Sequence, residues 1–289
     1  MDIKCYDYKF PGLNVNIREI QKVELELLLE FDKICKKNNI NYQLFAGTLL
    51  GAIRHNGFIP WDDDIDVCML REEYDRFLQV AKKDLSEDYF LQTYDSDNKY
   101  FYQFAKIRKN KTIFMQSILE EVNMHHGIFI DIFPFDNVKP HTIEGNTQRI
   151  VLNLFQLINS CRINKTISMT NNLLYKYVRL AIHYVLKIIP KRTMDNIITK
   201  VSRTFNNSNT EYVGDLSLST SKELYDRFTI KKNTFYDSLS WDFEGHYFPV
   251  PREYHEVLTK NYGDYMTPPP SQEPHHEIIE ICFDTEKKV

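Results

Sequence analysis

The spacing of apolar residues along the chain predicts a mixture of helices and short strands. Apolar positions recur every three to four residues over 17–39 and 71–84, which is the pattern of an amphipathic helix. Between them, residues 47–57 are bracketed by glycines and are expected to form a loop that leads into a short helix. Short apolar runs predict strands at 41–47, 64–70, 89–94, 100–108 and 127–133, the last of which Pro134 is expected to end.

The second half of the chain changes character. From 147 to 205 the pattern is helical, and breaks near 164–172 and at Pro190 predict three helices. Residues 250–266 predict a helix that Pro251 starts and Gly263 stops, followed by an extended, proline-rich stretch at 267–274. The order of elements therefore indicates an α+β fold in three parts: a core at 1–140, a helical insertion at 141–210 and a short α+β part at 211–289.

Composition indicates a soluble globular protein with a substantial core, because 43% of the residues are hydrophobic and 26% are charged. The net charge of −4 argues against a nucleic-acid partner. Five scattered cysteines without a C-x-x-C pair favour reduced thiols in a reducing compartment. No secretory signal and no apolar run of about 18 residues is visible, so we expect no transmembrane helix and a cytoplasmic location.

Charge is distributed unevenly along the chain. Segment 141–210 carries ten Lys or Arg and two acids, a net charge of +8. Within 173–192, Lys176, Arg179, His183 and Lys187 form one stripe on an otherwise apolar helix. Two interpretations stay open: the helix makes peripheral contact with the inner face of the cytoplasmic membrane, or it packs on the core with a solvated basic edge.

Four carboxylates lie within five positions, at Asp62, Asp63, Asp64 and Asp66, just before an apolar run. Side chains alternate between the faces of a strand, so Asp64 and Asp66 are expected to point the same way and Asp63 the opposite way. Asp131 is a further carboxylate, alone in the apolar strand "IFIDIF". Burying carboxylates is unfavourable unless a cation offsets their charge. Two Asp from one strand and one from a neighbour are typical of metal-assisted phosphoryl or nucleotidyl transfer.

Two other interpretations of the acidic run stay open at this point. Counted from Asp62, acids at positions 1, 3, 5 and 12 match the ligand spacing of a calcium-binding EF-hand loop, although position 6 is Val67, where that loop needs glycine. The run is also consistent with an acidic cap on the helix that begins near Arg71, a role that employs one carboxylate rather than four.

A longer motif is similar to a known family. The segment "FAGTLLGAIRHNGFIPWDDDID" (45–66) resembles the LicD family of phosphotransferases, and further motifs extend the resemblance over most of the chain outside 141–210. These motifs are "YFYQFAKIRKNKT" (100–112), "HGIFIDIFPFDN" (126–137) and "VPREYHEVLTKNYGDYMTPPP" (250–270).

The resemblance implies a branch of the nucleotidyltransferase fold, with a mixed β-sheet core, flanking helices and the helical insertion. Residues 1–140 are then the catalytic core, and 211–289 complete the catalytic domain. Members of the family transfer phosphocholine from CDP-choline, or a polyol phosphate from a CDP-polyol, to a sugar or polyol hydroxyl. By the same resemblance Asp64 and Asp66 are paired metal ligands, and Asp131 is the third carboxylate, as a ligand or as a base. Mg²⁺ or Mn²⁺ is the expected cofactor, since an all-carboxylate site favours these ions over zinc.

Small residues in the first motif are candidates for holding substrate phosphates. Gly47, Thr48 and Gly51 occupy the place where the wider nucleotidyltransferase fold usually has a Gly-Gly or Gly-Ser pair. Backbone N–H groups and a hydroxyl are suited to phosphate oxygens, so we expect these residues to cradle the donor.

Basic residues beside the motifs are candidates for pairing with phosphates. These are Arg54, Lys106 and Arg108, the last two on one face of a strand; a solvated edge strand is the alternative for that pair. Near the C-terminus the resemblance predicts an arginine among the prolines, but this chain has His275 and His276 there instead.

If the donor carries choline, its quaternary ammonium favours aromatic faces. Trp61 is the leading candidate because it directly precedes the acids, and the pair His125-His126 is a candidate for contact with the acceptor, with surface-loop histidines as the alternative. The other aromatic candidates, for which packing in the core is the alternative, are Tyr42, Phe58, Phe129 and Phe133.

The sequence therefore predicts a metal-dependent enzyme that transfers phosphocholine from CDP-choline to a hydroxyl of a cell-surface glycan. The glycan, free or lipid-linked, is a teichoic acid, a capsule or a lipooligosaccharide. A polyol-phosphate transferase that uses CDP-ribitol or CDP-glycerol is the alternative enzyme. A non-catalytic cation- or glycan-binding module is disfavoured, because such a module does not need all three carboxylates.

Overall fold

The computed structural model describes residues 8–163, 171–217 and 221–287 and has the α+β composition that the apolar spacing predicts. Its helices are α1 (Ile17–Lys37), α2 (Ala46–His55), α3 (Arg71–Asp84), α4 (Ile143–Ser160), α6 (Leu173–Ile188), α7 (Lys191–Ser202), α8 (Lys222–Arg227) and α9 (Tyr254–Tyr262), with the short helices η1 (Ser117–Leu119), η2 (Lys232–Phe235) and η3 (Thr285–Lys287). Its strands are β1 (Gln43–Leu44), β2 (Asp66–Leu70), β3 (Tyr89–Gln92), β4 (Ala105–Lys109), β5 (Ile113–Gln116), β6 (Phe129–Val138), β7 (Tyr212–Asp215), β8 (Thr229–Lys231), β9 (Ser238–Phe243), β10 (His246–Pro251) and β11 (Ile278–Cys282).

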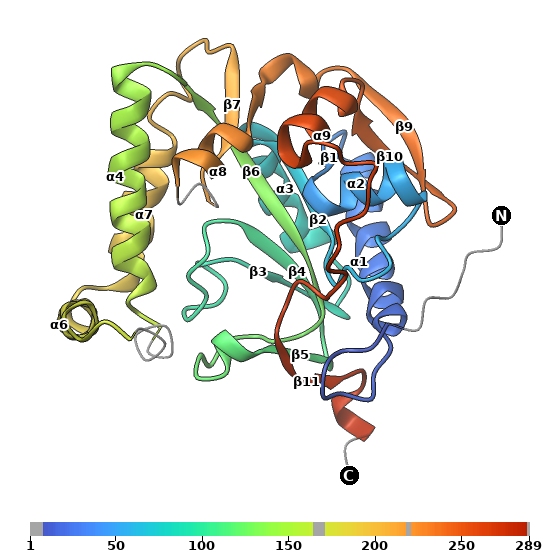
Figure 1. Ribbon diagram of the computed structural model, residues 1–289, viewed down its shortest axis with the longest axis horizontal. Coiled ribbons are helices and arrows are strands. Elements are labelled where there is room, and N and C mark those ends of the chain that lie inside the picture. Colours follow the sequence, from blue (N-terminus) through green and yellow to red (C-terminus); the bar gives the residue numbers. More distant parts are fainter. Residues whose placement is uncertain (1–7, 164–170, 218–220, 288–289) are drawn as a thin grey trace.

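β6 is the central strand of a mixed sheet (Figure 1). In the described residues seven strands form this sheet, in the order β1-β2-β6-β4-β3, while β7 pairs with the second half of β6 and then with β8. β2 runs parallel to β6, whereas β4 and β7 run antiparallel to it. All ten residues of β6 are buried, so neighbouring elements cover this strand on both faces.

The prediction that Pro134 ends its strand was wrong, because β6 continues beyond it. Pro134 lies where the partner of β6 changes, since β4 pairs as far as Ile132 and β7 begins at Phe135. The Asp131 N–H donates to Ile65 O on the β2 side, so alternation turns the nitrogen of Pro134 toward the junction between β4 and β7. A proline has no N–H for a ladder, and this junction is a place where a strand tolerates it.

Helices α1 and α3 pack on the sheet and on each other, α1 against β4 and β6 and α3 against β2 and β6. Asn16 caps α1, accepting from the Arg18 N–H at 2.8 Å, and Glu19 closes a capping box. α3 covers the predicted residues 71–84. Its apolar spacing forms one packed face, on which Tyr74, Phe77 and Ala81 are buried and Leu78 is half-buried.

Several predicted elements have different bounds in the structure. The strand expected over 41–47 keeps two residues, because α2 already begins at Ala46. The strand expected over 100–108 begins at Ala105, because the preceding loop folds back and the Tyr100 hydroxyl donates to Phe104 O. The helix expected over 250–266 starts later, since Pro251 is the last residue of β10.

The C-terminal part folds back over the beginning of the chain. β9 and β10 form a hairpin whose turn has positive φ at Glu244 and Gly245, as a tight two-residue hairpin turn requires. Trp241 Nε1 donates to Ala52 O at 3.0 Å, and Glu244 pairs with Arg18. β11 pairs with β5. These contacts hold the β9-β10 hairpin and β11 against elements from the first half of the chain.

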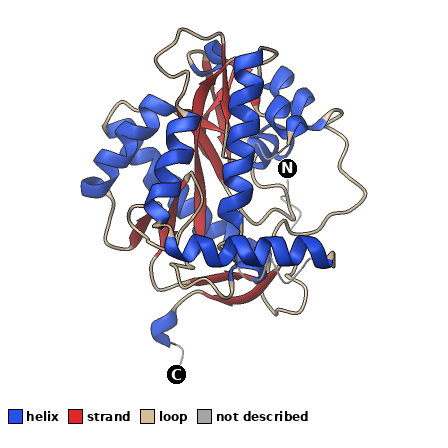
Figure 2. Ribbon diagram, turned by 90° about the vertical axis from the view of Figure 1, so that its left-hand side faces the viewer, coloured by secondary structure: helices blue, strands red, loops and turns tan. Residues whose placement is uncertain are grey.

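Helices α4, α6 and α7 form a group beside the sheet, as the helical pattern over 147–205 predicts; part of the expected break near 164–172 lies outside the described residues. Their shared cluster contains Leu152, Leu186, Met194 and Ile198. Figure 2 shows α6 lying across the ends of the upright helices. No described helix is long and apolar enough to cross a membrane.

Helix α6 turns part of its basic stripe inward, against the interpretation of a solvated basic edge. Arg179 is 5% exposed and donates to Ser160 Oγ at 3.1 Å, while His183 Nδ1 donates to Cys161 O at 2.8 Å. Both side chains therefore point toward the C-terminal end of α4, where free carbonyl groups favour positive charge. Of the four stripe residues Lys187 alone is exposed, so most of the stripe is not a solvated edge. The rest of the exposed face is apolar, with Leu174 75%, Tyr177 66% and Ile188 83% exposed.

Gly51 provides a test of the packing between α2 and the loop that follows it. A Cβ at this position would lie 2.5 Å from Gly57 O, so backbone has to move to accommodate it. Gly51→Ala is expected to lower the free energy of unfolding by about 1–3 kcal/mol despite the better helix propensity of alanine. Denaturant unfolding measures this, with Asn196→Ala on the exposed side of α7 as a control that changes stability by less than about 0.5 kcal/mol. A Gly51→Ala protein as stable as the parent would contradict this packing.

Candidate active site

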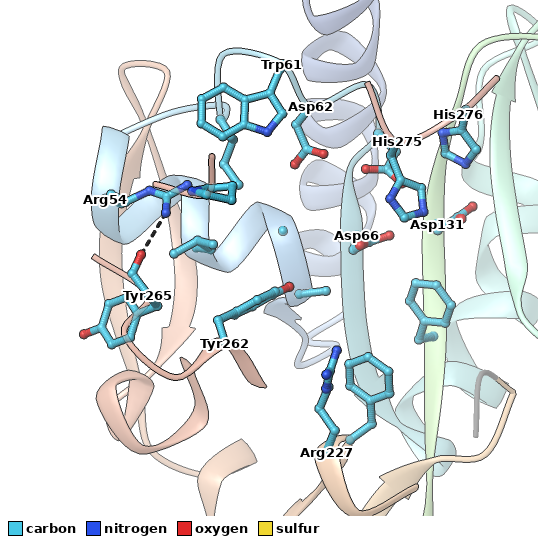
Figure 3. A pocket seen from close by; sticks show the side chains of 18 of the residues that line it. Arg54, Trp61, Asp62, Asp66, Asp131, Arg227, Tyr262, Tyr265, His275 and His276 are labelled. Carbon is cyan, nitrogen blue, oxygen red and sulfur yellow. Dashed lines mark hydrogen bonds between the residues drawn. The ribbon is translucent and has the colours of Figure 1, made fainter. Parts of the chain in front are cut away.

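The acidic run lies at the entrance to two parallel strands. Asp66 is the first residue of β2 and is the register partner of Asp131 in β6, so the backbone of the sheet places these two carboxylates side by side. Asp64, Asp66 and Asp131 all line one cavity of about 1050 Å³, which is roomy for a nucleotide-sized ligand. In Figure 3 the side chains of Asp66 and Asp131 project from neighbouring strands into this cavity.

The two other interpretations of the acidic run do not fit the structure. Asp66 to Leu70 form a strand and Arg71 begins a helix, so the run is not an EF-hand loop. The N-cap of α3 is Leu70, without a side-chain hydrogen bond, so the acids do not cap this helix either.

Seven of the ten residues expected at the site line the cavity. Besides the three carboxylates they are Gly47, Arg54, Trp61 and Lys106. A Cβ at Gly47 would lie 2.8 Å from Asp62 Oδ2, so the absence of a side chain lets this carboxylate approach α2. Arg54 Nη1 donates to Tyr265 O at 2.8 Å, which orients the guanidinium along the cavity wall.

Thr48, Gly51 and Arg108 lie outside the cavity lining and support it instead. The Thr48 hydroxyl accepts from the Asp66 N–H at 2.8 Å and so fixes the start of β2. Gly51 provides room for Gly57 O, as described above. The structure thus shows packing and positioning contacts for Thr48 and Gly51, and their contact with substrate phosphates stays a prediction.

Lys106 and Arg108 share one face of β4, as alternation predicts, but only Lys106 reaches the cavity. Both are buried, so the solvated edge strand is excluded. Lys106 Nζ donates to Asp131 Oδ1 at 2.5 Å and lies 3.4 Å from the centre of the Phe129 ring. Arg108 donates to Gly127 O at 2.6 Å and to Gln92. Burial is the main cause that lowers the pKa of Lys106, to about 8, and that of Arg108, to about 10.

Negative charge exceeds positive charge among the described groups of the cavity. Burial raises the pKa of Asp62 and of Asp66 well above the ordinary value, and the neighbouring Asp64 raises both further. Burial also raises the pKa of Asp64, which His276 and His275 act to lower. A carboxylate whose pKa is raised by other carboxylates has too little positive charge around it. The donor set is oxygen-rich, which fits a hard divalent cation.

Asp63 lies outside the cavity lining and anchors the C-terminal segment, although one of its oxygens lies within 4.8 Å of oxygens of Asp62 and Asp64. It is fully buried and accepts from the backbone N–H of His275 at 3.0 Å and of His276 at 3.2 Å. The His276 ring adds a contact from Nδ1 to Asp63 Oδ1 at 3.2 Å. Both histidines line the cavity where the family resemblance predicts an arginine.

Other residues of the cavity carried no clear signal in the sequence. Asp62 was visible only as part of the acidic run, and Tyr102, Phe104 and Tyr262 only as members of the longer motifs. Nothing marked Arg227 and Phe228. Of the aromatic candidates Trp61 and Phe133 line the cavity, whereas Tyr42, Phe58 and Phe129 are packed in the core.

The pair His125-His126 and the carboxylate of Glu24 lie outside the cavity lining. His125 Nε2 contacts Asn110 and His126 Nε2 donates to Val122 O, so both rings are held in a loop outside the cavity lining. Burial lowers the pKa of His125 to about 4. Glu24 on α1 is 1% exposed, and neither of its oxygens meets a hydrogen-bond partner among the described residues. Burial, followed by Asp64, raises the pKa of Glu24 well above its ordinary value.

Comparison with known proteins places these residues in a family. Residues 39–152 match the family model described as LicD/FKTN/FKRP, nucleotidyltransferase domain. The chain is 34% identical over 272 residues to the lipopolysaccharide cholinephosphotransferase LicD of Haemophilus influenzae. The matched region covers 91% of this chain and 96% of that protein. An uncharacterized protein of Rickettsia prowazekii is 29% identical over 125 residues, 41% of this chain and 47% of that protein. One of Rickettsia typhi is 44% identical over 55 residues, 19% and 18% of the two chains.

The unpartnered Glu24 provides a test of the charge imbalance. An unfolded glutamate loses its proton near its ordinary pKa of 4.5, whereas the folded chain retains it to higher pH. The folded state then binds more protons, so stability falls as the pH rises from 4.5 through the folded pKa, by about 1.4 kcal/mol per pKa unit. Glu24→Gln removes this contribution and is expected to gain stability relative to the parent at pH 7 but not at pH 4. Denaturant unfolding without added metal measures the difference.

Glu26→Gln is the matched control for this experiment, because Glu26 is exposed on the same helix. Its pH dependence is expected to follow that of the parent protein. The same pH dependence for Glu24→Gln and for the parent would show that Glu24 does not experience the acidic cluster.

Proposed function

The chain belongs to the LicD family of phosphotransferases, and we propose that it transfers phosphocholine from CDP-choline to a hydroxyl group of a lipopolysaccharide or another cell-surface glycan. As a member of this family it is a phosphotransferase enzyme. The observation that carries the proposal is the convergence of Asp64, Asp66 and Asp131 in one cavity of a chain that matches a cholinephosphotransferase over 91% of its length.

The proposal includes the architecture of the enzyme. We assign residues 1–140 and 211–289 to a catalytic domain with a nucleotidyltransferase-type sheet, and 141–210 to an insertion. The family match over 39–152 supports the first assignment. The separate apolar cluster of α4, α6 and α7 supports the second, although it also includes Val138, Leu216 and Tyr225 from the flanking elements.

Asp64, Asp66 and Asp131 are the residues that would hold Mg²⁺ or Mn²⁺. Such an ion neutralises charge on the donor pyrophosphate and on the transferring phosphoryl group. We assign Asp131 to the cation rather than to the acceptor hydroxyl, because it is the register partner of Asp66 and Lys106 already occupies one of its oxygens. Lys106 and Arg54 add positive charge at the cavity wall for phosphate oxygens.

The lining of the cavity favours choline over a polyol. A quaternary ammonium is attracted to aromatic faces and to carboxylates, and Trp61 stands directly beside Asp62 in the lining (Figure 3). We place the choline group at Trp61 and the acceptor glycan in the remaining open part of the cavity. CDP-ribitol and CDP-glycerol are the alternative donors, and their hydroxyl groups have no comparable preference for an indole ring.

Calorimetric titration with CDP-choline, CDP-ribitol and CDP-glycerol, each with and without Mg²⁺, tests the donor. CDP-choline is expected to bind only with the metal, and Asp66→Asn is expected to remove that dependence while the protein stays folded. Trp61→Leu is expected to weaken binding of CDP-choline about 3- to 30-fold, the range of a cation–π contact, and to leave the CDP-polyols unchanged.

Two outcomes would contradict this assignment. Preference for a CDP-polyol would move the enzyme to the alternative reaction. Equal binding of the donors with and without Mg²⁺ in folded protein would exclude the carboxylates as the site of a required cation.

We further propose that the enzyme works at the inner face of the cytoplasmic membrane, where a lipid-linked acceptor is within reach. The exposed face of α6 follows one helical stripe, formed by Leu174, Tyr177, Val178, Ala181, Tyr184, Val185 and Ile188. Such a face suits a helix lying in the membrane interface. The net charge of +8 over 141–210 suits anionic lipid, with exposed Lys187 and Arg192 at the end of the stripe.

Flotation with vesicles that contain anionic phospholipid tests this contact. The double variant Val178→Asp with Val185→Asp is expected to lose at least about tenfold in vesicle binding. It replaces exposed apolar area, which the membrane would bury, with charge. Asn171→Asp with Asn196→Asp adds the same charge without removing apolar area and is the control. Parent protein that ignores the vesicles, or that instead self-associates through these valines, would contradict membrane contact.

A further inference from the structure

The two histidines of the C-terminal segment form a group with Asp64 that has the composition of a metal site. One ligand atom from each of Asp64, His275 and His276 lies within 4.8 Å of the others. All three residues line the cavity, and Figure 3 shows His275 and His276 descending toward the carboxylates from the segment that crosses above them. This group shares Asp64 with the all-carboxylate set of the proposed magnesium site. Its other two ligands are imidazole nitrogens instead of carboxylate oxygens.

Asp63 supports this group in the way that carboxylates support metal-bound histidines. A ligating histidine usually donates its other ring N–H to a carboxylate or carbonyl, which fixes the tautomer and the orientation of the ring. His276 Nδ1 contacts Asp63 Oδ1 at 3.2 Å, so Nε2 is the nitrogen available to a ligand. Asp63 also accepts from both backbone N–H groups of the pair, which fixes the position of the segment.

Packing restricts the His276 ring further. It meets the rings of Phe114 and Phe129 edge-on, at 6.1 Å and 5.9 Å between centres. The strand that follows is held by pairing of β11 with β5 and by the Ser117 N–H, which donates to Glu277 O at 2.8 Å. A fully buried carboxylate, a fixed tautomer and a ring held by its neighbours are the features of a preorganised site rather than of a surface histidine pair.

We propose that Asp64, His275 and His276 form a second cation site, which takes a transition metal ion of the Mn²⁺, Co²⁺ or Zn²⁺ class. Two imidazoles and one carboxylate suit these ions, whereas Mg²⁺ prefers oxygen ligands. Asp64 belongs to both sites and is the carboxylate through which two cations would share the cavity, as in two-metal phosphoryl-transfer sites. The inference goes beyond the proposed magnesium site and does not depend on the identity of the donor.

The test is a Co²⁺ titration of the metal-free chain, followed by visible absorption, in a large excess of Mg²⁺ and without nucleotide. The parent protein is expected to bind Co²⁺ in the presence of Mg²⁺, with absorption that indicates nitrogen ligands. His275→Asn and His276→Asn are each expected to weaken Co²⁺ binding at least about tenfold, and Asp63→Asn about 10- to 100-fold through loss of orientation. His246→Gln, an exposed histidine on β10, is the control and is expected to change nothing.

His275 is exposed, so His275→Asn tests the site even if His276→Asn or Asp63→Asn does not fold. Displacement of Co²⁺ by Mg²⁺, or Co²⁺ affinity that is the same in the parent and in folded His275→Asn, would overturn the proposal. Because no donor is present, these outcomes are independent of whether CDP-choline is the substrate. Loss of CDP-choline binding alone would count against the proposed function and leave the second cation site standing.

Discussion

The constraint on which the site depends is an excess of buried negative charge. Asp62, Asp64 and Asp66 share one cavity with Asp131, and burial and mutual repulsion raise the pKa of the first three. The described positive groups at the cavity are too few to balance them, and Lys106 is already engaged by Asp131. Repulsion between these carboxylates is unfavourable in an empty site, and bound cations would offset it.

The scaffold holds this charge in place through backbone geometry more than through side-chain contacts. Parallel pairing of β2 with β6 puts Asp66 opposite Asp131. The Thr48 hydroxyl fixes the N–H of Asp66, and the missing side chain of Gly47 leaves room for Asp62. The C-terminal segment then covers the acids and is anchored through Asp63. Residues far apart in the sequence thus converge because the chain returns to its first strands.

Sequence reasoning reached the parts of this arrangement that local patterns encode. The period of apolar residues predicted α3 to the residue, and the expectation that Asp64 and Asp66 share one side agrees with their common cavity. It did not predict the β9-β10 hairpin or the role of Pro134, because both depend on which strand lies alongside. For the same reason it did not predict that Thr48, Gly51 and Arg108 lie outside the cavity lining, where tertiary packing gives them other contacts. The inward turn of Arg179 on α6 likewise depends on the end of a distant helix, which no helical period reveals.

The most direct test of the account is the position of cations in the cavity. Anomalous diffraction from crystals grown with Mn²⁺ and CDP-choline locates them without reference to activity. The account predicts a manganese peak among Asp64, Asp66 and Asp131 when the nucleotide is bound. Nucleotide bound in the cavity without a manganese peak at these carboxylates would contradict it.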